Sequence, residues 1–173
     1  MSDFTKLFSA AIAASIAVGG SAADYAGGVF LLNEGKYGTP ATICHLDGEG
    51  RWTDRALSAA NEGKTLGNTG SFAQFYGDFL YVVSKQANTA GAILTKADAA
   101  TLEIKAVSSD LGFSNCQGRA FLAVDPAKAY VGTTKGVAVV RLGDLSLAGT
   151  IDGILNDAGK EVECGNMARV DDR

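Results

Sequence analysis

The chain has 173 residues, of which 47% are hydrophobic and 20% charged, enough apolar material for the core of one domain. The net charge of −4 argues against the basic face that nucleic-acid-binding proteins need, so no nucleic acid is expected as a partner. The chain contains 22 glycines and 2 prolines, a balance that suits short strands joined by many tight turns.

The N-terminus has the layout of a secretory signal. Lys6 precedes an apolar run over residues 7–18, and small residues at 21–23 form a cleavage site before Asp24. The apolar run is shorter than the roughly 20 residues that a membrane-spanning helix needs. We therefore expect a signal peptide over residues 1–23 and a mature protein that is not membrane-spanning. A buried N-terminal helix is the alternative.

Beyond residue 23, short apolar or alternating runs are separated by Gly, Asp and Asn, and no helical period is sustained. Strands are predicted over residues 29–33, 41–46, 79–84, 92–96, 102–107, 121–124, 129–133, 137–142 and 147–151. This pattern is typical of an all-β sandwich, barrel or propeller.

Several markers recur at intervals of 46 to 51 residues, which indicates an internal repeat. They are the turn residues Asp78, Asp125 and Asp172, a second set of turn residues Asp47, Asp98 and Asp144, and the pairs Gly70 with Gly118 and Cys116 with Cys164. Each repeat contains four strands, with Asp turns after the first and third strands and a loop after the second. Four antiparallel strands in about 40–50 residues form the blade of a β-propeller.

We therefore predict an all-β fold, a β-propeller of four-stranded antiparallel blades with about three blades present. The blades are expected over residues 29–60, 67–113 and 116–153, and the start of a next blade over 164–173. Propellers have about 4–8 blades, so residues 24–173 are expected to form an incomplete ring and the chain to be an N-terminal fragment. An oligomeric ring and a compact β-sandwich or barrel are the alternatives.

Four segments resemble the exported YVTN/YncE-like β-propellers of Bacteroidetes. They are GVFLLNEGKYG at 28–38, GDFLYVVS at 77–84, AYVGTTKGVAVVRL at 129–142 and ECGNMARV at 163–170. The resemblance implies a single-chain ring of about seven blades. It also implies a place at the cell envelope, either periplasmic or at the cell surface. The lipid-attachment Cys of surface-anchored relatives does not follow the predicted cleavage point.

The resemblance implies an exported binding protein that captures a small molecule or nutrient, beside an outer-membrane transport component. A corrinoid-type ligand is one candidate, because a subset of the family captures corrinoids. No resident cofactor is expected. The alternatives are a propeller-scaffold enzyme, either a metal-dependent lactonase or hydrolase or a quinoprotein-like oxidoreductase, and a protein–protein interaction scaffold.

No catalytic or metal-binding residues are predicted. His45 is the only histidine, and no nucleophile elbow accompanies it. The Gly-Lys-Thr sequence at 63–65 lacks the upstream glycine of a phosphate-binding loop. The acidic residues near Asp47 lack the spacing of a calcium loop, and turn chemistry explains Asp47 without a metal.

Ligands of propellers bind at the mouth of the central channel, on the face built by two kinds of loop. In this chain those loops comprise residues 33–40, 56–68, 85–91, 111–117, 133–136 and 154–164. Their Lys, Asn and aromatic side chains suit a recognition surface. Arg119 and Met167, which follow the start of the first strand of a repeat, are expected to point toward the channel. The predicted ligand-binding residues are Lys36, Tyr37, Lys85, Asn88, Phe113, Asn115, Arg119, Lys135 and Met167.

The three cysteines are Cys44, Cys116 and Cys164, an odd number that leaves at least one without an intrachain partner. Cys116 and Cys164 occupy equivalent positions in neighbouring repeats. They are predicted either to form a disulfide, which requires Cα atoms within about 7 Å, or to pack as two buried thiols.

Overall fold

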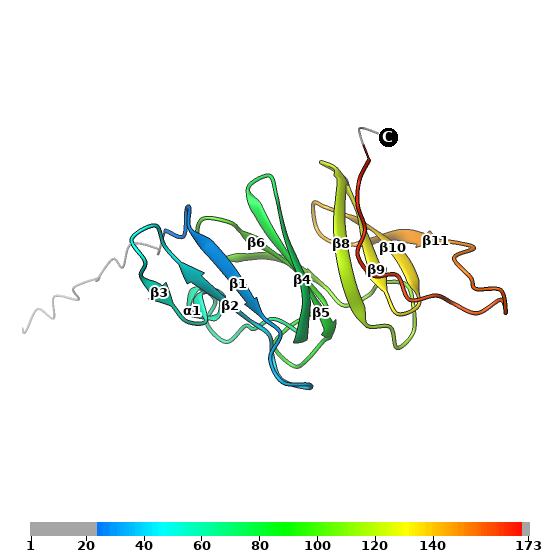
Figure 1. The fold of residues 1–173 in the computed structure, drawn as a ribbon, viewed down its shortest axis with the longest axis horizontal. Coiled ribbons are helices and arrows are strands. Elements are labelled where there is room, and N and C mark those ends of the chain that lie inside the picture. Colours follow the sequence, from blue (N-terminus) through cyan, green and yellow to red (C-terminus); the bar gives the residue numbers. More distant parts are fainter. Residues whose placement is uncertain (1–23, 171–173) are drawn as a thin grey trace, which may run out of the picture.

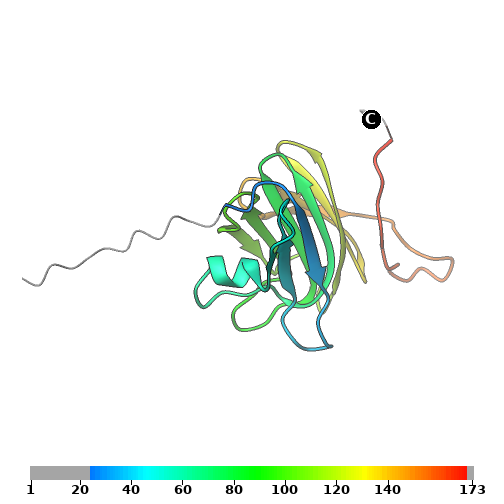
Figure 2. The ribbon, with the colours of Figure 1, turned by 60° about the vertical axis from the view of Figure 1, so that its left-hand side comes forward.

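The computed structural model describes residues 24–170, and within them the chain forms eleven β-strands and one short helix. The predicted signal peptide at 1–23 and the repeat marker Asp172 lie outside the described residues. The strands form three antiparallel sheets of three or four strands, which confirms the all-β prediction. Figure 1 shows the sheets following one another in chain order, and Figure 2 shows them stacked face to face.

In every sheet the neighbouring strands are consecutive in the chain. The first sheet comprises β1 (Val29–Asn33), β2 (Thr42–Leu46) and β3 (Trp52–Thr53). The second comprises β4 (Asn68–Tyr76), β5 (Phe79–Gln86), β6 (Leu94–Asp98) and β7 (Ile104–Ser108). The third comprises β8 (Gly118–Asp125), β9 (Lys128–Thr133), β10 (Gly136–Arg141) and β11 (Leu147–Ile151).

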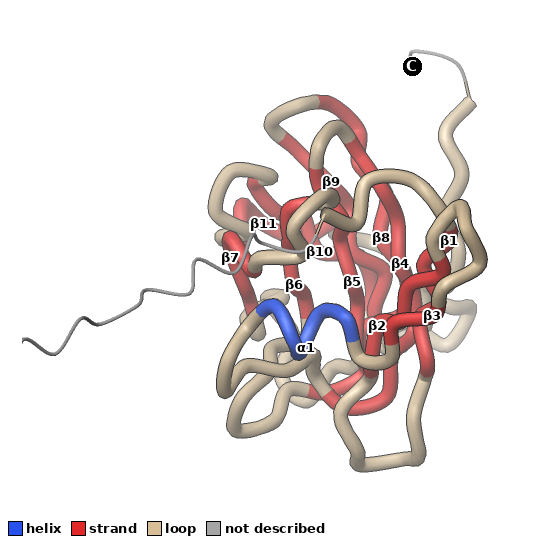
Figure 3. Tube along the Cα trace, turned by 90° about the vertical axis from the view of Figure 1, so that its left-hand side faces the viewer, coloured by secondary structure: helices blue, strands red, loops and turns tan. Residues whose placement is uncertain are grey.

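The predicted strand runs each overlap a strand of the structure, whereas β3, β4 and the helix α1 (Ala56–Ala60) correspond to none of those runs. A helix of this length is too short to show a helical period in the sequence. Leu57 of α1 is fully buried, and Figure 3 shows the helix beside β2. Asn61 ties the helix to the second sheet, because its amide donates to the Leu102 carbonyl and accepts the Ile104 N–H.

The segment 164–170 contains no strand, although a first strand was expected near residues 167–170. It lies beside β8 and β9, where the Cys164 N–H donates to the Thr133 carbonyl at 2.8 Å. Further along, Arg169 Nη1 donates to the Val124 carbonyl at 2.8 Å. Because these are isolated contacts and not a ladder with a neighbouring sheet edge, the segment is not a strand.

The second sheet is buried on both faces, because successive side chains of a strand point in opposite directions. Leu80 and Val82 of β5 belong to the core that the first two sheets share. Tyr81 and Val83 of the same strand belong to the core that the second and third sheets share. This double burial explains why β5 is almost continuously apolar and does not alternate.

The two interfaces between sheets are built alike. Phe30 meets Phe75 across the first interface, with ring centroids 5.3 Å apart, and Tyr81 stacks on Phe121 across the second at 4.7 Å. The repeat marker Gly118 also lies at an interface, where a Cβ atom would stand 2.5 Å from the Ser84 carbonyl oxygen. A side chain at this position would therefore force the second and third sheets apart. The sheets are thus repeat-like in packing as well as in sequence.

The turn residues Asp47, Asp98 and Asp144 share one local structure. In each case Oδ1 accepts a backbone N–H two to four residues further on, at 2.8 Å for Asp47 and Asp98 and at 2.9 Å for Asp144. This confirms the prediction that turn chemistry explains Asp47. The backbone hydrogen bonds are the main reason why the pKa of all three carboxyl groups lies below its ordinary value.

We expect these lowered pKa values to make the fold acid-sensitive. A carboxyl group with a lower pKa in the folded state stabilises the fold above its unfolded pKa, and this contribution is lost as pH falls through the folded pKa. The free energy of unfolding should therefore decrease below about pH 4. Urea unfolding between pH 7 and pH 2 measures the effect. The triple variant D47N/D98N/D144N should show a weaker acid dependence, and an unchanged dependence would contradict this account.

Candidate functional site

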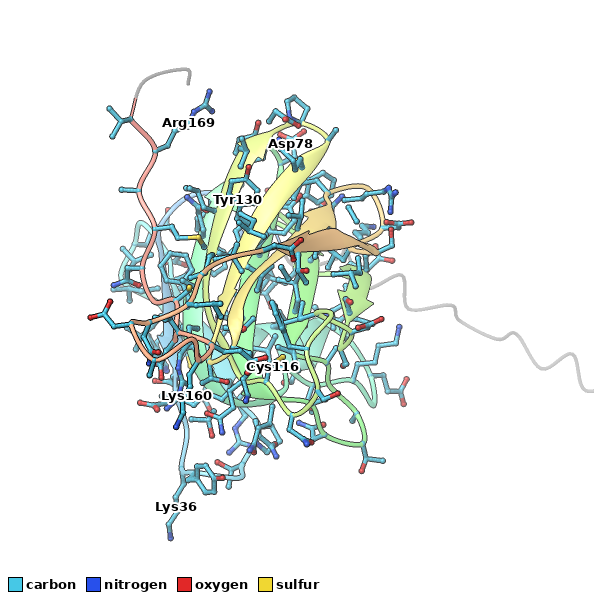
Figure 4. The ribbon with its side chains drawn as sticks, turned by 90° about the vertical axis from the view of Figure 1, so that its right-hand side faces the viewer. Lys36, Asp78, Cys116, Tyr130, Lys160 and Arg169 are labelled. Atoms are coloured by element: carbon cyan, nitrogen blue, oxygen red, sulfur yellow. The ribbon has the colours of Figure 1, made fainter. Side chains whose placement is uncertain are left out.

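The sheets have two chemically different ends. At the loop end, β1, β5 and β9 finish and β4 and β8 begin, so the long loops of the chain gather there. At the opposite turn end, the short turns join β4 to β5 and β8 to β9. Figure 4 shows Lys36, Cys116 and Lys160 toward the loop end and Asp78 at the turn end. Most of the predicted ligand-binding residues belong to the loop end.

Two contacts connect the first and second sheets at the loop end. Lys85 Nζ pairs with Glu34 Oε1 at 2.7 Å, and Gln86 Nε2 donates to the Tyr37 hydroxyl at 3.4 Å. Tyr37 is nevertheless 73% exposed, and Lys36 projects from the tip of the same loop. The structure therefore brings Lys85 and Tyr37 to one side of the molecule, together with a carboxylate that the sequence analysis did not select.

Two further ion pairs connect the third sheet with the segment before residue 164. Arg119 Nε pairs with Glu163 Oε1 at 2.6 Å, and Lys135 Nζ pairs with Glu161 Oε2 at 2.8 Å. Arg119 Nη1 is buried without a hydrogen-bond partner in the structure. The guanidinium group thus retains a donor that no neighbouring group satisfies in the structure. Both acidic partners were missed, because nothing local in the sequence connects residues more than 20 positions apart.

Three of the predicted residues serve the architecture of their loops. The Asn88 amide donates to the Leu66 carbonyl at 2.9 Å and accepts the Ala90 N–H at 2.8 Å, so its polar atoms are already engaged. Phe113 packs against the core between the second and third sheets. Asn115 adopts a left-handed backbone conformation with φ 53°, which Asn tolerates better than most residues.

Met167 lies away from the ion pairs of the loop end. It lines a cavity of about 580 Å³ between the third sheet and the segment 167–170. Leu122, Val124 and Tyr130 form the sheet side of this cavity. The structure therefore does not place Met167 with Lys85 and Tyr37.

All three cysteines are free thiols, so of the two arrangements predicted for Cys116 and Cys164 the disulfide is absent; Cys116 packs as a buried thiol, whereas Cys164 is only partly buried. The two positions are equivalent in the repeat, but their sulfurs are not bonded. Cys164 Sγ instead points to the Val162 carbonyl oxygen in the same segment, 3.6 Å away. Burial raises the pKa of both thiols, which keeps them protonated and weakly nucleophilic at neutral pH.

His45 has a role in packing. Its ring is buried at the turn end between Tyr25 and Phe30, and Nε2 lies 2.7 Å from the Gly27 carbonyl oxygen. Within residues 24–170, no group of three or more His, Cys, Asp or Glu side chains is placed to hold a metal ion. Over the same residues, no helix is long and apolar enough to cross a membrane.

We expect the ion pair of Lys85 and Glu34 to contribute little to stability. Replacing Lys85 by Met should lower the free energy of unfolding by less than about 1 kcal/mol, because the pair is partly exposed to water. The loss should shrink in about 1 M salt, which screens exposed charges. Urea unfolding at low and high salt measures both effects. Lys36→Met is the matched control, and an equal loss in the two variants would contradict this assignment.

The fold defines a class of repeat-like all-β proteins built from three antiparallel sheets of three or four strands. The family model described as a domain of unknown function (DUF5074) matches residues 27–173. Because this match covers most of the chain, the protein belongs to that family. A comparison with curated proteins finds no match.

Proposed function

We propose that the three sheets are consecutive blades of a β-propeller and that the loop end binds a small molecule. The repeated interface supports the first part of this proposal. The stacking of Tyr81 on Phe121 and the close approach at Gly118 place the third sheet on the second much as Phe30 and Phe75 place the second on the first. A constant step between antiparallel four-stranded sheets is how a propeller is built.

The polar side chains of the loop end support the second part. Basic side chains from two different sheets lie together at the loop end. Lys85 comes from the second sheet, and Arg119 and Lys135 come from the third. Each is held by a carboxylate, which leaves further N–H donors in fixed positions. The single observation that carries the proposal is the buried Arg119 Nη1 without a partner, because native structures rarely leave such donors unused.

A corrinoid-type ligand fits this chemistry. A corrin ring is broad and flat, and its rim carries amide groups that accept and donate hydrogen bonds. The charged and aromatic side chains of the loop end, such as Lys85, Arg119 and the exposed Tyr37, match such a rim. The resemblance of the sequence to envelope propellers that capture corrinoids supports the same class.

The experiment is a titration of the full-length protein with cyanocobalamin, adenosylcobalamin and cobinamide by isothermal titration calorimetry. We expect at least one dissociation constant below the millimolar range. Arg119→Met should weaken binding at least tenfold, and Arg51→Met is the matched control, because Arg51 forms an exposed ion pair within a turn of the first sheet. No binding tighter than millimolar by any of the three compounds would overturn the corrinoid proposal.

Export to the cell envelope is part of the proposal and is tested separately. We expect the protein recovered from the periplasm or the cell surface to begin near Asp24, because small residues precede this position after an apolar run. N-terminal sequencing of the native protein measures the cleavage point. A mature protein that still begins at Met1 would overturn the proposed signal peptide.

A further inference from the structure

A second concave site lies at the turn end, between the second and third sheets. Its cavity has a volume of about 370 Å³, within the range of small-molecule sites. We call it the turn-end pocket. Its walls are formed by Tyr76, Phe79, Tyr81, Pro126 and Leu142, and Lys96 also faces it. The pocket is therefore mostly aromatic and apolar, and it lies at the opposite end of the strands from the loop end.

The positively charged group of this pocket is a buried ammonium. Lys96 is only 8% exposed, which is unusual for a lysine. Its Nζ donates to the Leu142 carbonyl at 2.8 Å and lies 4.0 Å from the centre of the Phe79 ring. A third contact, to the Gly143 carbonyl, measures 3.4 Å and is at the weak limit of a hydrogen bond.

Lys96 forms no ion pair among residues 24–170. A buried charge that is not balanced by an opposite charge is costly, and carbonyl dipoles and an aromatic face compensate it only in part. The Lys96 N–H that points to the Gly143 carbonyl, 3.4 Å away, forms the weaker hydrogen bond and is the donor that is easiest to redirect. A carboxylate entering the pocket would accept a charge-assisted hydrogen bond from it and would neutralise the ammonium.

The remaining walls determine which carboxylate fits. The accessible apolar walls are Tyr76, Phe79 and Pro126, which are not fully buried and can pack against an aromatic group of the ligand. Asp78 also lines the pocket and repels negative charge, so only a carboxylate placed at Lys96 is compensated, and a second negative charge on the ligand would be repelled without compensation. The cavity is large enough for one or two rings. These features together select a small aromatic acid that carries a single carboxylate.

We propose that the turn-end pocket is a binding site for small aromatic monocarboxylates, with Lys96 as the group that binds the carboxylate. The site is formed by the contacts of Lys96 and the cavity between two sheets, and it shares no residue with the loop end proposed for the corrinoid.

The test is a titration of the full-length protein with phenylacetate and indole-3-acetate, with phenylacetamide as the neutral analogue. We expect saturable binding of at least one acid with a dissociation constant below the millimolar range, and binding of the amide at least tenfold weaker. Lys96→Met should weaken acid binding at least tenfold. Arg119→Met should leave it unchanged, which separates this site from the loop end.

A second measurement guards against loss of folding in the Lys96→Met variant. In the wild-type protein labelled with ¹³C at lysine, the Cε signal of Lys96 should move in proportion to acid bound, whereas those of exposed lysines such as Lys36 should not. Lys96→Arg, which keeps the charge, assigns the signal by its loss. The proposal is overturned if neither acid saturates, if amide and acid bind equally, or if the Lys96 signal stays in place while an acid binds.

Discussion

Replacing Gly118 with alanine should lower the free energy of unfolding by about 3 kcal/mol, because the added methyl group has no space. A Cβ atom at this position would stand 2.5 Å from both the Ser84 carbonyl oxygen and Val83 Cγ1. The first of these is backbone in the middle of the second sheet and cannot rotate away. The two sheets must therefore separate locally, and thermal or urea unfolding measures the cost.

Gly48→Ala is the matched control for this substitution. Nothing lies within 4 Å of a Cβ atom built at Gly48, and its backbone is outside the left-handed region. We expect its free energy of unfolding to stay within about 0.5 kcal/mol of the wild type. If Gly118→Ala proves as mild as Gly48→Ala, the second and third sheets do not approach as closely as described.

Replacing Phe121 with alanine should remove about 3–5 kcal/mol from the free energy of unfolding. Phe121 is only 1% exposed and stacks on Tyr81 with an interplanar angle of 13°. Its removal leaves a cavity in the core between the second and third sheets, in addition to the loss of buried apolar surface. Urea unfolding measures the change, with one m-value (the dependence of the free energy of unfolding on urea concentration) used for both proteins.

Phe75→Ala provides the comparison, because Phe75 contacts Phe30 across the first interface but is 47% exposed. Its loss should cost well under half as much. A double-mutant cycle with Tyr81→Ala should reveal a coupling of about 0.5–1.5 kcal/mol between Phe121 and Tyr81. Equal effects of the two Phe substitutions would indicate that the second interface is no better packed than the first.

The strands and the period of the chain were predictable because both depend on local chemistry. Runs such as residues 79–84 carry the apolar residues of a buried strand, and Asp47, Asp98 and Asp144 carry the turn chemistry in their own side chains. The ends of each strand were less accurate, since ladder pairing and not composition decides where a strand stops. The short helix α1 left no periodic signal of its own.

The site was less predictable because its contacts join distant parts of the chain. Glu34 and Lys85 are 51 residues apart, and only the packing of the first sheet on the second brings them together. The same reasoning applies to Lys96: a lysine in a strand is ordinarily placed in solvent, and only the turn after β10, which supplies the Leu142 carbonyl, buries it. Asn88 has a local role that its residue type did not indicate, since its side chain forms hydrogen bonds within its own loop region.

The double burial of the second sheet has a consequence for dynamics. The first and third sheets are each covered on one face by the second, whereas the second is covered on both. Stability in such an array depends on contacts between neighbours, as in other repeat proteins. Amide hydrogen exchange should therefore be slowest in β5 and β6, and the first sheet, with only the short β3 at one edge, should open without unfolding the rest. The chain is thus expected to lose its structure from the outside inward, in separate steps.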